Sequence, residues 1–246
     1  CSSDLDYHGS FAAYQQVKMD FMKDYPGDAI LPSDYQDLII DFDHRGIGGF
    51  NEDNLKLSIQ ILVACGFSYD VVCSILATIP MPPGRFEHIH MQQPFDVIVD
   101  YAHTPDGLSH LLSECHWITK KNGGRLLTLF GCGGDRDRGK RAKMGQQAIY
   151  FSDQIMVTSD NPRDEDPGDI IQDVLVGIED QPAVFSCLDR KEAIQTILSW
   201  AGPQDVVVIA GKGHETGQVI RGVTYPFQDQ TVVKEVLKEM GFGHFD

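Results

Sequence analysis

The chain has 246 residues, and its 20 Lys and Arg against 36 Asp and Glu give a formal net charge of −16. This acidic balance argues against non-specific binding to nucleic acid, which requires a basic face. It is compatible with a small anionic ligand, because such a site needs only a few local cations. The length fits one large α/β domain or two small ones, and a hydrophobic content of 42% fits a well-packed core.

No stretch of about 18 apolar residues is present, so the sequence predicts no membrane span. We also expect no secretory leader, because a basic start followed by an apolar middle is missing. The chain begins without Met, which leads us to expect a fragment or an edited chain. Its six cysteines are scattered and form no C-x-x-C pair, so reduced thiols in a cytoplasmic protein are the simplest interpretation.

In chain order, the N-terminal part predicts little regular structure. One helix is expected over residues 10–24 and one strand over residues 38–42. A helical pair is expected next, over residues 51–65 and 68–78, and it ends in a Pro-rich connector at residues 79–85.

From about residue 95, strand-like and helix-like segments alternate. The strand-like segments are short, rich in Val, Ile or Leu and not alternating in polarity, which is typical of strands covered on both faces. They span residues 95–102, 125–131, 154–160, 183–189 and 205–211. Helical patterns lie between them and at the end, over residues 107–119, 140–151, 168–178, 190–200 and 231–240. This alternation predicts an α/β fold with a Rossmann-like doubly wound, mostly parallel sheet.

Polar and glycine-rich loops follow four of these strands. They read DYAHTPD after the first strand, GCGGDRDRGKR after the second, SDNPRDEDP after the third and AGKGHET after the fifth. Ligands of doubly wound sheets bind beyond the carboxyl ends of the strands. The Gly, Asp, Arg, Lys and His residues of these loops therefore predict a binding site at that edge.

The loop GCGGDRDRGKR nearly matches a phosphate loop, but Arg141 stands where Ser or Thr would hold magnesium. Its glycines allow a ligand to approach the backbone closely, and its arginines match carboxylate or phosphate. The alternative is a solvated basic turn in which Asp135 and Asp137 pair with the arginines.

The loop SDNPRDEDP carries groups of both charges. Asp160 and Asn161 could bind an ammonium while Arg163 could bind a carboxylate, and together they would suit an amino acid. The alternative is an Asx turn followed by a helix cap from Asp166.

Two further loops leave two interpretations open. In AGKGHET, Gly211 permits a sharp backbone path that presents Glu215 at a strand end, or the segment is only a structural turn. In DYAHTPD, Asp100 could accept a hydrogen bond from a ribose hydroxyl and His103 could face a phosphate, or Thr104 simply caps a helix.

Taken together, these motifs resemble the C-terminal domain of the Mur ligases. The matching strings are, in chain order, GGFNEDN, PPGRFE, VIVDYAHTPDGL, FGCGGDRDRGKR, TSDNPRDEDP, DVVVIAGKGHE and PFQDQ, over roughly residues 48–230. The string DNPR is similar to that of family members selecting meso-diaminopimelate, whereas lysine-adding members usually carry another residue at the position of Arg163. The resemblance implies an amino-acid-binding C-terminal domain over residues 48–246.

The N-terminal string SSDLDYHGSFAAYQQVKMDFM resembles the late part of the central ATPase domain of the same family. Residues 1–47 would then be a remnant of that domain, with Lys18 where the family has a carbamylated, magnesium-binding lysine. Val17 replaces the usual Ala, a His expected between Asp4 and Leu5 is missing, and so is the family's phosphate loop. We therefore expect no ATP hydrolysis by this chain alone.

The resemblance implies an ATP-dependent amide ligase of peptidoglycan synthesis. ATP would phosphorylate the D-glutamate carboxylate of UDP-MurNAc-L-Ala-D-Glu, and the amine of meso-diaminopimelate would then attack the acyl phosphate. The implied cofactors are ATP and Mg²⁺. The implied partners are these small molecules rather than nucleic acid or a membrane, and we expect a cytoplasmic monomer.

The resemblance also implies roles for individual residues. Those implied to hold meso-diaminopimelate are Arg136, Asp160, Asn161, Arg163, Gly211 and Glu215. Those implied to contact ATP are Asn54, Arg85, Asp100 and His103. Lys18 has the implied catalytic role, through magnesium and the phosphates.

Other functions stay open at this point. The protein could add lysine instead, or act as a folylpolyglutamate-type ligase. Because the phosphate loop is absent, it could also be a non-catalytic fragment that only binds an amino acid. A dinucleotide-binding oxidoreductase is disfavoured, since no strand is followed by G-x-G-x-x-G.

Overall fold

The computed structural model describes residues 49–76, 78 and 82–243, together with residues 10, 12, 13, 15–17 and 20. The chain divides into two compact units, Cys1–Pro80 and Met81–Asp246. The domain boundary expected between residues 47 and 48 rests on the family resemblance, so it stays a prediction. Among the described helices, none combines the length and the apolar character that a membrane crossing requires.

The first unit contains the expected helical pair. α3 spans Gly49–Ala64 and α4 spans Tyr69–Leu76, within a few residues of the ranges that the sequence predicts. The helix expected over residues 10–24 lies mostly outside the described residues, and the strand expected over residues 38–42 lies entirely outside them.

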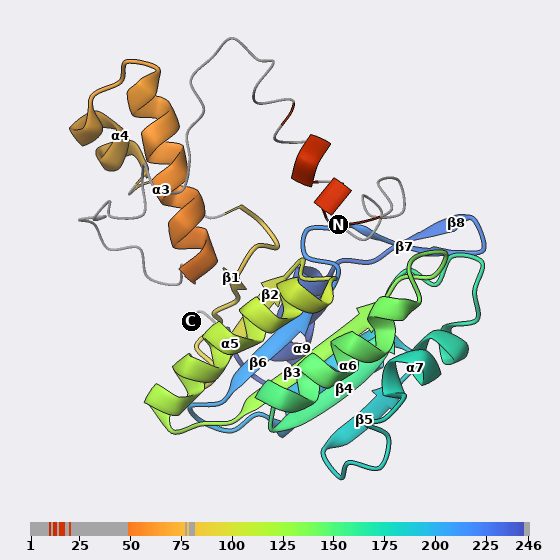
Figure 1. Ribbon diagram of the computed structural model, residues 1–246. Helices are drawn as coiled ribbons and strands as arrows, with labels where there is room; N and C mark the ends of the chain where they lie inside the picture. The colour runs from red at the N-terminus through yellow and green to blue at the C-terminus, as the bar shows by residue number, and fades with distance from the viewer. Residues whose placement is uncertain are drawn as a thin grey trace. The chain divides into compact units, whose positions relative to one another are not determined.

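The second unit contains a six-stranded sheet (Figure 1). Its strands lie in the order β1-β2-β6-β3-β4-β5, and every neighbouring pair is parallel except β1 with β2. Their bounds are β1 Glu87–His88, β2 Asp96–Asp100, β3 Leu126–Cys132, β4 Gln154–Ser159, β5 Val184–Cys187 and β6 Val206–Ala210. The expected α/β fold with a doubly wound, mostly parallel sheet is confirmed.

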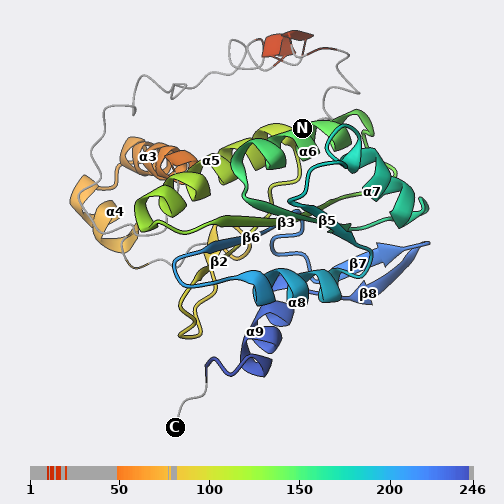
Figure 2. The same cartoon turned by 90° about the horizontal axis from the view of Figure 1, so that it is seen from below.

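Helices cover both faces of this sheet. Their bounds are α5 Pro105–Asn122, α6 Gly139–Phe151, α7 Pro167–Leu175, α8 Arg190–Trp200 and α9 Asp229–Glu239. Figure 2 shows α5, α6 and α7 on one face and α8 and α9 on the other. A short antiparallel hairpin of β7 (Gly217–Ile220) and β8 (Val223–Pro226) follows β6, and the sequence did not predict it.

The central strands form where the sequence is apolar toward both faces. Every residue of β3 and β6 is buried. In β6, Val207 and Ile209 pack into the core shared with α8 and α9. Because successive side chains of a strand point to opposite faces, Val206 and Val208 face the other helical layer. Two-sided burial explains why these strands read as continuous apolar runs.

Side-chain caps define the first residues of α5 and α7, the helices that follow β2 and β4. Thr104 accepts a hydrogen bond from the backbone N–H of Gly107, and Asp166 accepts one from Gly168. Both helices begin at a proline, whose missing N–H costs nothing at the first helical position. The expected caps are therefore confirmed, and the two helices begin slightly earlier than the apolar pattern indicates.

Candidate functional site

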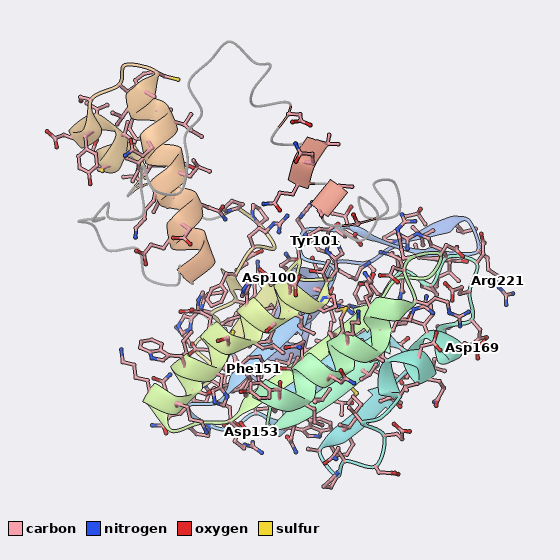
Figure 3. The ribbon with its side chains drawn as sticks, in the orientation of Figure 1. Asp100, Tyr101, Phe151, Asp153, Asp169 and Arg221 are labelled. Atoms are coloured by element: carbon pink, nitrogen blue, oxygen red, sulfur yellow. The ribbon has the colours of Figure 1, made fainter. Side chains whose placement is uncertain are left out.

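The candidate site lies along the edge where the parallel strands have their carboxyl ends, as the strand pattern predicts. Figure 3 shows Asp100 and Tyr101 at this end of the sheet, and Asp153, which precedes β4, at the opposite end. The loops after β2, β3, β4 and β6 all begin here. We call them the loop rim, which comprises residues 100–104, 132–138, 159–166 and 210–216.

Glycines allow the loops of the rim to touch one another, and the segment before β1, through their backbones. A Cβ on Gly134 would lie 1.9 Å from the carbonyl oxygen of Pro162, and a Cβ on Gly84 would lie 2.1 Å from the backbone nitrogen of His214. Since the opposing atoms belong to the backbone, no side-chain rotation could relieve these overlaps. Glycine at these positions therefore holds GCGGDRDRGKR against SDNPRDEDP, and PPGRFE against AGKGHET.

A buried cluster around Lys212 joins the loops after β4 and β6. The Lys212 side chain is inaccessible to solvent, and its Nζ lies 3.0 Å from Oε2 of Glu215 and 3.2 Å from Oδ1 of Asn161. Oδ1 of Asp160 lies 3.8 Å from the same ammonium. Nδ2 of Asn161 also donates to Oε2 of Glu215 over 2.8 Å. Gly211 borders the cluster, since a Cβ there would lie 2.8 Å from Oδ2 of Asp160.

Arg163 connects this region with the loop after β3. Its Nη1 donates to the carbonyl oxygen of Gly134 over 2.7 Å. A Cβ on Gly133 would lie 2.8 Å from that Nη1 and 3.8 Å from Cγ of Arg136. The side chains of Arg163 and Arg136 therefore flank Gly133, and both belong to the same rim.

The hairpin β7–β8 holds the loop after β4 in place. The backbone N–H of Arg163 donates to the carbonyl oxygen of Val219 over 2.9 Å, and the N–H of Arg221 donates to the carbonyl oxygen of Arg163 over 2.7 Å. The N–H of Val219 donates to Oδ1 of Asn161 over 2.9 Å. The Asn161 side chain is thus bonded to residues distant in sequence. The alternative in which this loop forms a local Asx turn at Asn161 is therefore wrong.

Two other arginines of the loop after β3 pair with groups further along the chain. Arg141 is fully buried and lies 2.8 Å from oxygens of both Glu165 and Asp173. Arg138 lies 3.0 Å from Asp173. The hydrogen bonds from Arg141 are the largest cause of the lowered pKa of each carboxyl group, which burial partly opposes.

The alternative in which Asp135 and Asp137 pair with these arginines is wrong. Oδ2 of Asp135 accepts the backbone N–H of Asp164 over 3.1 Å, and Oδ1 of Asp137 accepts the N–H of Gly139 over 2.8 Å. In the described part of the chain, neither aspartate forms an ion pair. Arg136 is exposed and bonds only a backbone carbonyl among the described residues, so its guanidinium is available to a ligand.

Arg85, Asp100 and His103 gather around Tyr101 at the end of β2. The Cζ atom of Arg85 lies 4.9 Å from the centre of the Tyr101 ring, and the His103 ring centre lies 4.6 Å from it. Asp100 is buried, and each of its carboxylate oxygens accepts a backbone N–H at 2.7 Å. Burial raises the pKa of Asp100, while those hydrogen bonds and the nearby Arg85 and His103 oppose the shift.

The structure brings most of the expected site residues together. Six lie on the loop rim within one network of contacts: Arg136, Asp160, Asn161, Arg163, Gly211 and Glu215. Three of the four residues expected to contact ATP lie around Tyr101. The fourth, Asn54, is exposed on α3 of the other unit, and Lys18 lies outside the described residues. The roles of all these residues stay predictions.

Two further charged residues support the rim: Arg190, which the sequence did not single out, and Lys140, which belongs to the cations of GCGGDRDRGKR but whose partner was not predicted. Arg190 and Asp229 form a fully buried ion pair at 2.8 Å, and Arg190 also donates to the carbonyl oxygen of Ala210. Nζ of the buried Lys140 donates to the carbonyl oxygen of His103 over 2.7 Å. Neither role has a local signal, because the partners are far away in sequence. Lys212, by contrast, lies inside the string AGKGHET, where two flanking glycines could have drawn attention to it.

The polar groups of the rim are suited to binding a ligand and stabilising charge. Cys132, at the end of β3, is a poor nucleophile because burial raises its pKa to about 12. Among the described residues, no group of three or more His, Cys, Asp or Glu is arranged to hold a metal ion. What the rim offers is a set of carboxylates, arginines and an amide at fixed positions.

Comparison with known proteins places this sheet and its loops in a family. Residues 84–213 match the family model described as Mur ligase, glutamate ligase domain. The UDP-N-acetylmuramoyl-L-alanyl-D-glutamate–2,6-diaminopimelate ligase of Aquifex aeolicus (strain VF5) is 42% identical over 234 residues, which cover 94% of this chain and 47% of that protein. The ligase of the same name from Solibacter usitatus (strain Ellin6076) is 47% identical over 190 residues, covering 74% of this chain and 38% of that protein. A solved structure of a ligase of this name aligns with a TM-score of 0.62 at 37% identity, over 79% of this chain and 39% of that chain.

The matched segment takes up more than half of the chain and contains the loop rim up to residue 213, so the chain belongs to the Mur ligase family. It spans less than half the length of the two named relatives. The activity, substrates and partners of the whole protein are therefore matters for proposal.

Proposed function

We propose that this chain is the amino-acid-binding part of an ATP-dependent ligase that adds meso-diaminopimelate to UDP-MurNAc-L-Ala-D-Glu in peptidoglycan synthesis. A carboxylate is a poor electrophile, and phosphorylation by ATP with Mg²⁺ makes it reactive. Attack of the amine on the acyl phosphate then forms the amide and releases phosphate. The loop rim would hold and orient the diamino acid for that attack.

One observation carries this proposal: a guanidinium and two carboxylates occupy the same network of the loop rim. The distal end of meso-diaminopimelate has one carboxylate and one ammonium. Arg163 would bind the carboxylate, which its planar fork matches, with Arg136 beside it. Asp160 and Glu215 would bind the ammonium. Lysine has no distal carboxylate, so it would leave Arg163 without a partner.

We propose a separate role for the residues around Tyr101. Arg85, Asp100 and His103 would contact ATP, with Asp100 suited to a ribose hydroxyl and the two others to phosphates. Asn54 would also contact ATP, and Lys18, if carbamylated, would bind magnesium. The protein would act as a cytoplasmic monomer on small molecules.

Isothermal titration calorimetry of the 246-residue chain tests the choice of amino acid. A hydrogen-bonded charge pair contributes about 1.5–3 kcal/mol, so meso-diaminopimelate should bind roughly ten- to a hundredfold more tightly than L-lysine. Equal affinities or a preference for L-lysine would contradict the proposal in favour of a lysine-adding ligase. Tighter binding of L-glutamate than of either would instead favour a folylpolyglutamate-type ligase.

The same titrations repeated with ATP separate a ligase part from a simple binding module. If the rim works together with a nucleotide site, ATP should change the affinity for meso-diaminopimelate. An affinity for meso-diaminopimelate that is the same with and without ATP would favour the non-catalytic module.

A further inference from the structure

The ammonium of Lys212 lies in the part of the loop rim where, under the proposed function, the ammonium of the ligand would bind. Its side chain is inaccessible to solvent, and its Nζ contacts Glu215, Asn161 and Asp160 at 3.0, 3.2 and 3.8 Å. Burying an ammonium is unfavourable unless it is paired and hydrogen-bonded. The three contacts meet that need, and they also tie the ammonium to three residues expected to hold the ligand.

A hydrogen bond from Lys212 helps to fix the orientation of Asn161. Oδ1 of Asn161 faces two donors, Nζ of Lys212 at 3.2 Å and the N–H of Val219 at 2.9 Å. Its Nδ2 faces a carboxylate, which can only accept. If the amide were turned over, Nδ2 would face the two donors and Oδ1 would face the carboxylate, and no hydrogen bond could form. Lys212 and the N–H of Val219 together determine which end of Asn161 reaches Glu215.

The same contacts leave acceptor capacity for one more cation. Oε2 of Glu215 accepts from both Lys212 and Asn161, whereas within residues 82–243 its Oε1 accepts no hydrogen bond. The carboxylate of Asp160 forms its ion pair with Lys212, and no hydrogen bond from a described residue reaches it. Each carboxylate thus keeps at least one oxygen for a ligand.

The net charge of the cluster also indicates that it can accept one more cation. Two carboxylates face one ammonium, which leaves a single negative charge. Arg190, which also interacts electrostatically with Asp160 and Glu215, is already neutralised by Asp229 in a fully buried pair. One ligand ammonium would complete the balance, whereas without Lys212 two unpaired carboxylates would repel each other. Glu215, whose side chain is 32% exposed, could then turn toward solvent.

The backbone on either side of Lys212 is shaped to turn its side chain inward. Gly211 has a φ of 112° and Gly213 a φ of 51°, both in the region that favours glycine. A Cβ on Gly213 would lie 2.7 Å from the carbonyl oxygen of Gly84. The string GKG therefore combines two conformationally special glycines with one buried ammonium.

We propose that Lys212 is a positioning residue of the amino-acid site. It holds Asp160, Asn161 and Glu215 in the arrangement that accepts one ligand ammonium, and it does not itself touch the ligand. This inference rests on the proposed function for the nature of the ligand, but the arrangement it assigns to Lys212 can be tested without ligand.

The binding test compares meso-diaminopimelate with 2-aminopimelate, which lacks one amino group, by calorimetry on the 246-residue chain. A site built around a ligand ammonium should prefer meso-diaminopimelate by at least about 100-fold. In Lys212→Met the preference should fall below about tenfold, mainly through weaker binding of meso-diaminopimelate. The control Lys191→Met, which removes an exposed ion pair with Glu235, should keep the full preference. An unchanged preference in a folded Lys212→Met variant would overturn the proposal.

A double variant, Lys212→Met with Asp160→Asn, separates positioning from charge and guards against misfolding. It keeps the net charge of the cluster at −1 and leaves no second carboxylate to repel Glu215. Because Asp160→Asn also removes a proposed partner of the ligand ammonium, the reference is Asp160→Asn alone, which keeps Lys212. If Lys212 positions Glu215 and Asn161, the double variant should prefer meso-diaminopimelate less strongly than Asp160→Asn does. An equal or stronger preference in the double variant would show that only the charge matters and would refute a positioning role.

A crystal structure of ligand-free Lys212→Met tests the positioning role of Lys212 without any assumption about the ligand. The proposal predicts loss of the 2.8 Å bond between Asn161 and Glu215. Retention of that bond would overturn it, whatever amino acid the protein binds. The two proposals can also fail separately. If the wild-type chain binds the two pimelates equally well, the proposed function is contradicted. If Glu215 is nevertheless displaced in Lys212→Met, the positioning role of Lys212 is still supported.

Discussion

Arg163 has an unusual backbone for an arginine, since its φ of 52° lies in the left-handed region. Its side chain donates to Gly134, while its N–H and carbonyl groups bond the hairpin β7–β8. The left-handed turn costs about 1 kcal/mol or more for a residue with a Cβ, and these bonds offset it. The guanidinium is thereby held at a fixed place on the loop rim.

Replacing Arg163 by Ala should weaken the binding of meso-diaminopimelate by roughly ten- to a hundredfold, because one charged hydrogen-bonded pair is lost. The affinity for ATP should stay within about twofold. Arg221→Ala is a matched control, since Arg221 also has a left-handed φ, of 48°, and an exposed side chain that Figure 3 shows at the hairpin. Calorimetry on both variants checks this, and equal losses for ATP and the diamino acid would refute the assignment.

Gly134→Ala should impair the site through the backbone alone. The new Cβ would lie 1.9 Å from the carbonyl oxygen of Pro162, which forces the loops after β3 and β4 apart. We expect a loss of about 2 kcal/mol or more in the free energy of unfolding and weaker binding of meso-diaminopimelate. In the control Gly202→Ala the nearest atom would be 3.7 Å away, so urea unfolding should detect little change. Equal stability of the two variants would be incompatible with the backbone contact described above.

At this scale the sequence predicted local roles and missed distant ones. The caps at Thr104 and Asp166 follow from residues next to the helices, so they could be predicted. The alternative in which Asp135 and Asp137 pair with the arginines was wrong, because backbone N–H groups compete with the arginines for these carboxylates. The role of Lys212 depends on Asp160 and Asn161, which lie about 50 residues earlier in the chain.

Among the elements, α6 and α7 are joined by a buried guanidinium. Arg141, in the first turn of α6, pairs with Glu165 in the loop before α7 and with Asp173 on α7. A buried arginine that loses a partner is strongly destabilising. The pair of helices therefore depends on the ionisation of these two carboxyl groups.

This dependence predicts a specific loss of stability in acid. The pKa of Glu165 is lowered from its ordinary value of 4.5 and that of Asp173 from 3.8. A carboxyl group with a lowered pKa in the folded state stabilises the protein above its unfolded pKa, and that stabilisation is lost as the pH falls through the folded pKa. Stability should therefore decline below about pH 4.5.

Glu165→Gln should lower the free energy of unfolding by about 1–2 kcal/mol at pH 7 and make the acid decline shallower. Urea unfolding between pH 7 and about pH 3 measures both effects. The control Glu235→Gln removes an exposed pair with Lys191 and should change stability by less than about 0.5 kcal/mol. An acid decline of unchanged steepness in Glu165→Gln would show that Arg141 does not couple to this carboxyl group.

The elements of the sheet were predictable because their burial is simple. Strands such as β3 and β6 are buried on both faces, and the helices between them have one apolar face, so each has a clear sequence pattern. The hairpin β7–β8 was missed because its residues are all exposed or half-buried, which gives neither an apolar run nor an alternation. It forms nonetheless, since Arg163 and Asn161 bond its first strand.

Across the whole second unit, the topology of the sheet accounts for the site. Parallel strands bring four loops to one edge, and glycines with short backbone contacts lock those loops together. The resulting loop rim has arginines beside a cluster of two carboxylates and one lysine. The place of the site could be predicted from the order of strands and loops, whereas its internal hydrogen bonds could not.

The central claim is that the loop rim receives the distal, zwitterionic end of a diamino acid. A crystal structure of the chain with bound meso-diaminopimelate tests it most directly. We predict a ligand carboxylate about 3 Å from the guanidinium of Arg163 and the neighbouring ammonium at hydrogen-bonding distance from Asp160 and Glu215. A ligand bound away from the rim, or one whose ammonium does not contact these two carboxylates, would contradict the claim.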